Sequence, residues 1–76
     1  MRLKLTVHAQ ERIAERRIDT DDIKRVIQSP DKKKPDLQGM KAQKNFGKRT
    51  LVVIYSKEEF RDKHDEFLVI TAYYLK

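Results

Sequence analysis

The sequence contains no cysteine, no tryptophan, and only two glycines and two prolines among its 76 residues. Without cysteine, neither a disulfide framework nor a thiolate zinc site can reinforce the fold, so a small core must rely on packing or on dimerisation. A glycine-rich phosphate-binding loop is excluded, because Gly39 and Gly47 are the only glycines. The longest apolar run, LVVIY at residues 51–55, is too short to span a bilayer.

These absences define a broad class of protein. A chain of this length has room for one core, so we expect a single domain over residues 1–76. Nothing in the sequence resembles a signal peptide, and we therefore expect a cytoplasmic protein without a membrane segment. Both a monomer and a homodimer are compatible with the composition.

Positive charge is concentrated in the middle of the chain. The net charge is +6, and most of the excess lies between residues 30 and 49. The basic residues there are Lys32, Lys33, Lys34, Lys41, Lys44, Lys48 and Arg49, against only Asp31 and Asp36. Such a segment attracts polyanions and favours an RNA- or DNA-binding surface. Lysines that only keep the protein soluble give the same pattern.

Two helices are indicated by their capping residues. The first should begin near Thr6, a favourable N-cap. The second should begin after Asp19, an N-cap followed by two more aspartates in the first turn, where negative charge suits the helix dipole. It should end at SP, residues 29–30, because proline disfavours helical geometry in the preceding residue. Capping explains all three aspartates, so we expect no metal site, and no pattern calls for a cofactor.

Four segments have strand character. RLKLT at residues 2–6 alternates polar and apolar side chains, and three further strands are expected within MKAQKNF (40–46), TLVVIY (50–55) and FLVITAYY (67–74). The stretch DKKKPDLQG, residues 31–39, is expected to form a loop. The order is then β-α-α-β-β-β, which predicts an α+β domain with two helices packed on one face of an antiparallel sheet.

The segment HAQERIAERRI, residues 8–18, places chemistry-bearing side chains on one helix face. His8, Arg12 and Arg16 share a narrow stripe, and Ala9 and Ile13 form the adjacent stripe that should face the core. Solvated charges on an amphipathic helix give the same pattern. Arginine, however, binds phosphate oxygens in a planar fork, and imidazole can move a proton near neutral pH. The stripe is therefore a candidate phosphoryl-transfer site.

The pattern HAxxRxxxRxI, followed by an acidic-capped helix ending at SP, resembles the domain of unknown function (DUF) 4258 family. The VIT of FLVITAYY is similar to that family's last strand. The matching positions are His8, Ala9, Arg12, Arg16, Ile18 and Thr71, of which Ala9 and Ile18 look structural. The family's layout is similar to the RelE and barnase-like ribonucleases of toxin–antitoxin systems. This resemblance implies metal-independent RNA cleavage and an antitoxin-like protein partner.

The residues and the resemblance lead to one hypothesis for an active site. His8 would act as base or acid, Arg12 and Arg16 would hold the phosphate, and Thr71 and Tyr73 would bind phosphate or complete a proton relay. His64, in a charged turn, is expected to be an exposed loop residue. Two alternatives stay open: a non-catalytic RNA- or DNA-binding module using the seven basic residues above, and a protein-interaction domain whose last strand pairs with a partner.

Overall fold

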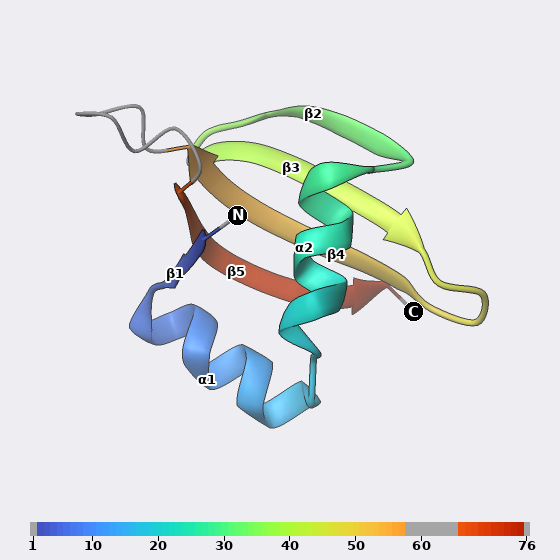
Figure 1. The fold of residues 1–76 in the computed structure, drawn as a ribbon, viewed down its shortest axis with the longest axis horizontal. Helices are drawn as coiled ribbons and strands as arrows, with labels where there is room; N and C mark the ends of the chain where they lie inside the picture. Colours follow the sequence, from blue (N-terminus) through green and yellow to red (C-terminus); the bar gives the residue numbers. More distant parts are fainter. Residues whose placement is uncertain (1, 58–65, 76) are drawn as a thin grey trace.

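Two helices and five strands make up the computed structural model, which describes residues 2–57 and 66–75 (Figure 1). In chain order they are β1 (Arg2–Leu5), α1 (Val7–Arg16), α2 (Thr20–Gln28), β2 (Lys32–Asp36), β3 (Gly39–Asn45), β4 (Thr50–Lys57) and β5 (Glu66–Leu75). The strands form one sheet in the order β1-β5-β4-β3-β2. The predicted α+β class is confirmed.

Both helices begin, and the second also ends, where their local sequences predict. The side chain of Thr6 accepts a hydrogen bond from the backbone N–H of Ala9, and that of Asp19 accepts one from Asp21. Each bond satisfies one of the backbone donors that a helix leaves free in its first turn. The second helix ends at Gln28, directly before the Ser29-Pro30 pair.

The sheet differs from the expected one at both edges. The segment predicted as a loop contains β2, which pairs antiparallel with β3, so the prediction of a loop there was wrong. Lysines and a proline give this strand little β character, but an edge strand needs a partner on one side only and tolerates Pro35. At the other edge β1 pairs with β5 in parallel, so the sheet is mixed rather than wholly antiparallel.

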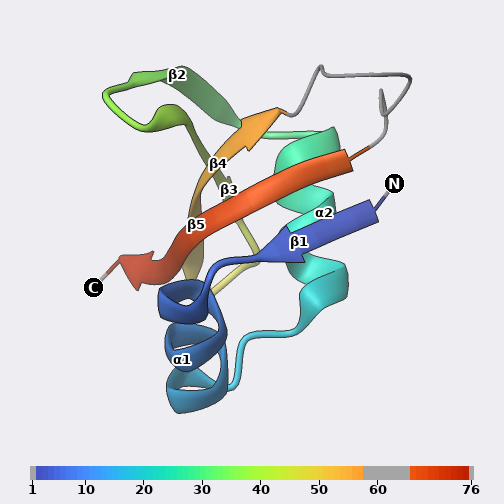
Figure 2. The same ribbon diagram turned by 90° about the vertical axis from the view of Figure 1, so that its left-hand side faces the viewer.

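The hydrophobic core lies between the helices and one face of the sheet. Figures 1 and 2 show α2 lying across this face and α1 beside the edge formed by β5. The helices bury Ala9, Ile23, Val26 and Ile27, and the sheet buries Ala42, Leu51, Val53, Tyr55, Val69 and Ala72. Among the partly buried residues packed against this cluster, Phe67 meets the Tyr55 ring edge-on at 5.7 Å.

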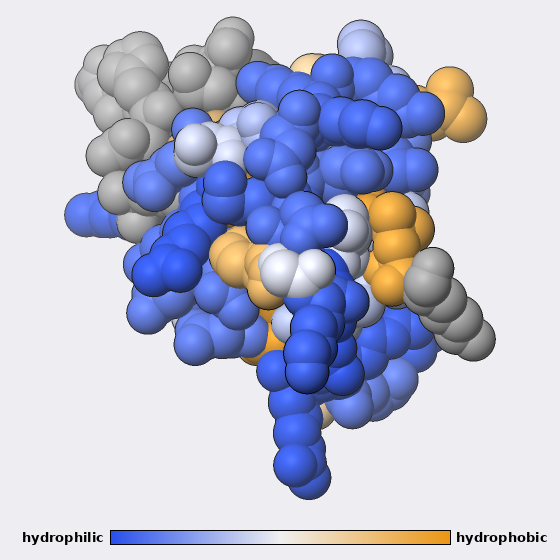
Figure 3. Space-filling model, turned by 90° about the vertical axis from the view of Figure 1, so that its right-hand side faces the viewer, coloured by the Kyte–Doolittle hydropathy of each residue, from blue (hydrophilic) through white to orange (hydrophobic). Residues whose placement is uncertain are grey.

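Few large apolar side chains reach the surface. Among the described residues Val7 of α1, Leu37 in the turn between β2 and β3, and Leu75 of β5 are exposed. On the side of the molecule drawn in Figure 3, hydrophobic areas are small and set among hydrophilic ones. On this side, the described part of the surface is dominated by charged and polar groups.

Candidate functional site

The N-terminal motif lies on α1, which is fixed to β5 at both of its ends. The Thr6 hydroxyl donates a 3.0 Å hydrogen bond to the carbonyl of Ile70, and Nη1 of Arg16 donates one of 3.3 Å to the carbonyl of Ala72. β1 pairs with residues 66–69 of β5 and goes no further. Helix α1 thus occupies the edge of β5 where β1 has ended.

The three polar residues of the motif have different surroundings. His8 is exposed, and its side chain forms no hydrogen bond or ion pair within the described part of the chain. Arg12 is paired with Glu15, one turn away, at 2.9 Å, with 35% of its side chain exposed. Arg16 is the member of this stripe that donates a hydrogen bond to the sheet. An exposed pair such as Arg12–Glu15 contributes less than about 1 kcal/mol, so a phosphate can replace Glu15 as the partner of Arg12.

The predicted residues of β5 lie on the sheet face away from the core, which we call the back face. Thr71 is directly opposite Ile54, and Tyr73 is directly opposite Val52. They flank Ala72, the residue whose carbonyl accepts the hydrogen bond from Arg16. The fold therefore places the Arg16 guanidinium next to the strand positions of both hydroxyl side chains. No hydrogen bond or ion pair in the described ranges joins His8 or Arg12 to either of them.

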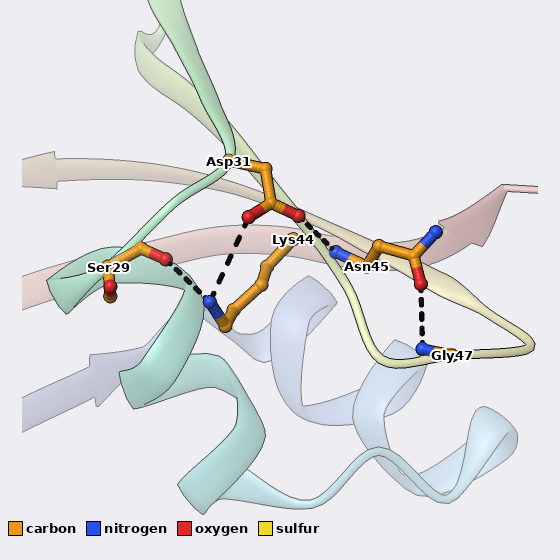
Figure 4. Close-up of polar contacts among 5 residues, drawn as sticks. All are labelled: Ser29, Asp31, Lys44, Asn45 and Gly47. Carbon is orange, nitrogen blue, oxygen red and sulfur yellow. Dashed lines mark hydrogen bonds and ion pairs between the residues drawn. The ribbon is translucent and has the colours of Figure 1, made fainter.

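The seven basic residues of the middle segment do not form one surface. Lys44 is part of a structural network at the end of α2 (Figure 4). Its ammonium donates to the carbonyl of Ser29 at 3.0 Å and lies 3.9 Å from Asp31, which also accepts a hydrogen bond from the backbone of Asn45. Lys44 thereby links the segment after α2 to β3.

Three further basic residues also point away from the back face or lie beyond the strands. The guanidinium of Arg49 lies 4.5 Å from the centre of the Tyr74 ring, and Tyr74 packs against the core. Lys33 is directly opposite the buried Ala42, so it belongs to the helix side of the sheet. Lys48 is exposed in the turn between β3 and β4.

The remaining three lysines gather on the back face of β2 and β3. Lys34 is directly opposite Lys41, and Lys32 is directly opposite Gln43. These four residues, with Lys33 between Lys32 and Lys34 in β2, line a depression of about 370 Å³. Within residues 2–57 and 66–75 no carboxylate forms an ion pair with Lys32, Lys34 or Lys41. Within those ranges the depression is thus a concentration of positive charge without an ion-pair partner.

Sequence patterns alone missed Gln43, Val52 and Ile54 as neighbours of the candidate site. Val52 is fully buried although it lies outside the helix-side core cluster, and its direct cross-strand neighbours are Gln43 and Tyr73. The alternation of side chains along MKAQ and TLVVIY was the available signal. Because residues 31–39 were expected to form a loop, that signal could not place Lys32 and Lys34 on the same sheet face as Gln43.

The described ranges contain neither a cluster of metal ligands nor a helix that could span a membrane. There, no three His, Cys, Asp or Glu side chains gather as potential metal ligands. No helix in this part of the chain is long and apolar enough to cross a bilayer. His64, predicted to be an exposed loop residue, lies outside the described residues.

The protein is a small α+β domain. Its arginine-bearing helix α1 lies beside β5, and a cluster of lysines lies on the back face of β2 and β3. A model of the family described as Domain of unknown function (DUF4258) matches residues 5–74. The protein belongs to this family, as the N-terminal motif predicted. No curated protein and no solved structure matches the chain significantly.

Proposed function

We propose that this protein is a toxin-like ribonuclease, which binds RNA and cleaves it without a metal ion where α1 meets β5. The hydrogen bond from Arg16 to the carbonyl of Ala72 is the observation that carries this proposal. It brings a permanent cation of the helix next to Thr71 and Tyr73, whose side chains lie on the back face. A phosphate bound there would meet a guanidinium from one side and hydroxyl groups from the other.

In the proposed reaction the exposed imidazole of His8 takes the proton of a ribose 2′-hydroxyl, and that oxygen attacks the adjacent phosphorus. Arg12 and Arg16 stabilise the additional negative charge on the phosphoryl oxygens, to which Thr71 and Tyr73 donate hydrogen bonds. The bond from phosphorus to the 5′ oxygen breaks and leaves its electron pair on that oxygen, which takes a proton from water. The hydroxide so formed accepts the proton held by His8. The products are a 2′,3′-cyclic phosphate and a 5′-hydroxyl.

The similarity of the family's layout to RelE and barnase-like ribonucleases supports two further parts of the proposal. The protein acts in the cytoplasm, and a small antitoxin-like protein neutralises it. Both parts depend on the cleavage activity.

Cleavage is tested by incubating the purified protein with RNA in EDTA and examining the ends of the fragments. We expect 2′,3′-cyclic phosphate ends, and a loss of at least about 100-fold in rate for His8→Ala. His8 is exposed and has no polar partner in the described structure, so this change should leave thermal stability unaltered. Arg25→Ala, which removes an exposed arginine from α2, is the matched control. Equal rates for both variants, or cleavage abolished by EDTA, would overturn the mechanism.

A non-catalytic RNA-binding module is the second candidate, and the three lysines of the back face, none of which forms an ion pair with another described residue, favour it. In that case RNA binding would persist with a steep dependence on salt, because each neutralised phosphate releases counterions. No variant would then differ in fragment production, because none would cleave RNA.

A further inference from the structure

The lysines of the back face are arranged in a way that costs energy in the free protein. Lys34 and Lys41 are directly opposite each other on neighbouring strands, where like charges repel. Lys32 projects from the same face of β2, two residues before Lys34 and about 7 Å away along the strand. An anion with several negative groups along its length would neutralise all three together. A single small anion would not.

Beside these lysines the back face becomes apolar and aromatic. Val52 is fully buried there, and the half-buried Ile54 and Tyr73 lie next to it. The hydroxyl of Tyr73 forms no hydrogen bond within the described residues. An aromatic ring next to a cationic groove is the arrangement that proteins use to stack an unpaired base, at about 1–3 kcal/mol per base.

The distance between the lysines and Tyr73 suits a nucleotide. Neighbouring strands are about 4.8 Å apart, so β3 and β5, with β4 between them, are separated by about 10 Å. A nucleotide whose phosphate rests on Lys41 can extend its base over β4 towards Tyr73. In a duplex the bases are stacked inside the helix and only their edges face the grooves, so a duplex would use the lysines alone.

We propose that the back face binds single-stranded RNA, with phosphates on Lys32, Lys34 and Lys41 and an unpaired base on Tyr73. The inference rests on the RNA binding proposed above and names its substrate class. It also gives Tyr73 two separable roles. The ring stacks on a base, and the hydroxyl donates a hydrogen bond to the phosphate. Gln43, between the lysines and Val52, is placed to hydrogen-bond the edge of that base.

The test measures binding of a fluorescent oligouridylate methylated at every 2′-hydroxyl, which cannot be cleaved by the proposed reaction. We expect it to bind about 10-fold more tightly than an RNA duplex of equal length. Lys34→Gln and Lys41→Gln should each weaken binding several-fold and reduce the salt slope by about 0.7. Lys24→Gln, which removes the same charge from α2 on the opposite side of the sheet, should do neither.

Two changes at Tyr73 separate the inference from the proposed cleavage. Tyr73→Leu should weaken binding about 10-fold without changing the salt slope, whereas Tyr73→Phe should bind normally and cleave unmodified RNA more slowly. Equal affinity for single strand and duplex, or equal losses for Lys24→Gln and Lys34→Gln, would overturn the inference even if RNA is cleaved. Selective single-strand binding without any cleavage would leave it standing and refute the ribonuclease.

Discussion

The hydroxyl of Thr6 donates a 3.0 Å hydrogen bond to the carbonyl of Ile70, 64 residues further along the chain. The same hydroxyl accepts a hydrogen bond from the N–H of Ala9, and the Thr6 N–H donates to the carbonyl of Val69. Ile70 is the residue of β5 that the pairing with β4 skips. One side chain therefore caps α1 and attaches its start to an irregularity of the sheet next to the candidate site.

Replacing Thr6 by valine should lower the free energy of unfolding by about 1–2 kcal/mol, because the cap and the bond to Ile70 are lost while the shape is kept. Urea denaturation followed by circular dichroism measures this difference. Thr6→Ser retains the hydroxyl and should stay close to the wild type. Equal stability of the serine and valine variants would show that neither hydrogen bond matters.

Gly39→Ala should be strongly destabilising. Gly39 has a φ of +150°, and a Cβ at this position would overlap the backbone carbonyl oxygen of Tyr55. The backbone conformation alone costs about 1–3 kcal/mol for a residue with a side chain, and the overlap adds to it. Gly47 provides the comparison: its φ is +93°, but a Cβ there meets no atom within 4 Å. In thermal melts we expect Gly47→Ala to lower Tm less than Gly39→Ala, and the reverse order would contradict this reasoning.

Arg17→Gly should stabilise the protein. Arg17 ends α1 in the left-handed conformation, with φ 52° and ψ 48°, a conformation that costs a residue with a side chain about 1–2 kcal/mol. Glycine adopts it freely but loses more chain entropy on folding, so we expect a net gain of about 0.5–1 kcal/mol. Arg17→Ala removes the same charge and keeps the strain, so in parallel urea titrations it should give no such gain.

Lys44→Gln and Lys34→Gln should have opposite consequences. Lys44, with 26% of its side chain exposed, holds the carbonyl of Ser29 and the carboxylate of Asp31, so its replacement should cost about 1 kcal/mol of stability. Lys34 is exposed and has no ion-pair partner in the described structure, so its replacement should reduce RNA affinity instead. Thermal melts of both variants measure the loss of stability, and RNA titrations measure the loss of affinity. Equal effects on affinity would mean that the whole basic segment acts by net charge alone.

Much of the helical part of the fold was predictable. Thr6 and Asp19 cap their helices as expected, Ser29-Pro30 ends the second, and Ala9 and Ile18 are buried. Capping and helical periodicity depend on residues within about one turn of one another, so a short stretch of sequence contains the necessary information.

The sheet edges and the candidate site were less predictable. β2 has a poor strand sequence and exists because β3 offers it a partner, and β1 is held in parallel by the distant β5. The motif predicted that His8, Arg12 and Arg16 share a helix face. It did not reveal that Arg12 is paired with Glu15 while Arg16 reaches β5.

The sequence by itself determined the two helices, the family and the presence of seven cations in one short segment. Only the tertiary structure decided where those cations lie and which groups they contact. Strand register sends Lys32, Lys34 and Lys41 to the back face, whereas Lys44 and Arg49 are engaged by Ser29 and Tyr74. The physical reason is that successive side chains of a strand point to opposite faces of the sheet. Which face a charged side chain occupies is therefore fixed only when its strand pairs with a neighbour in a given register.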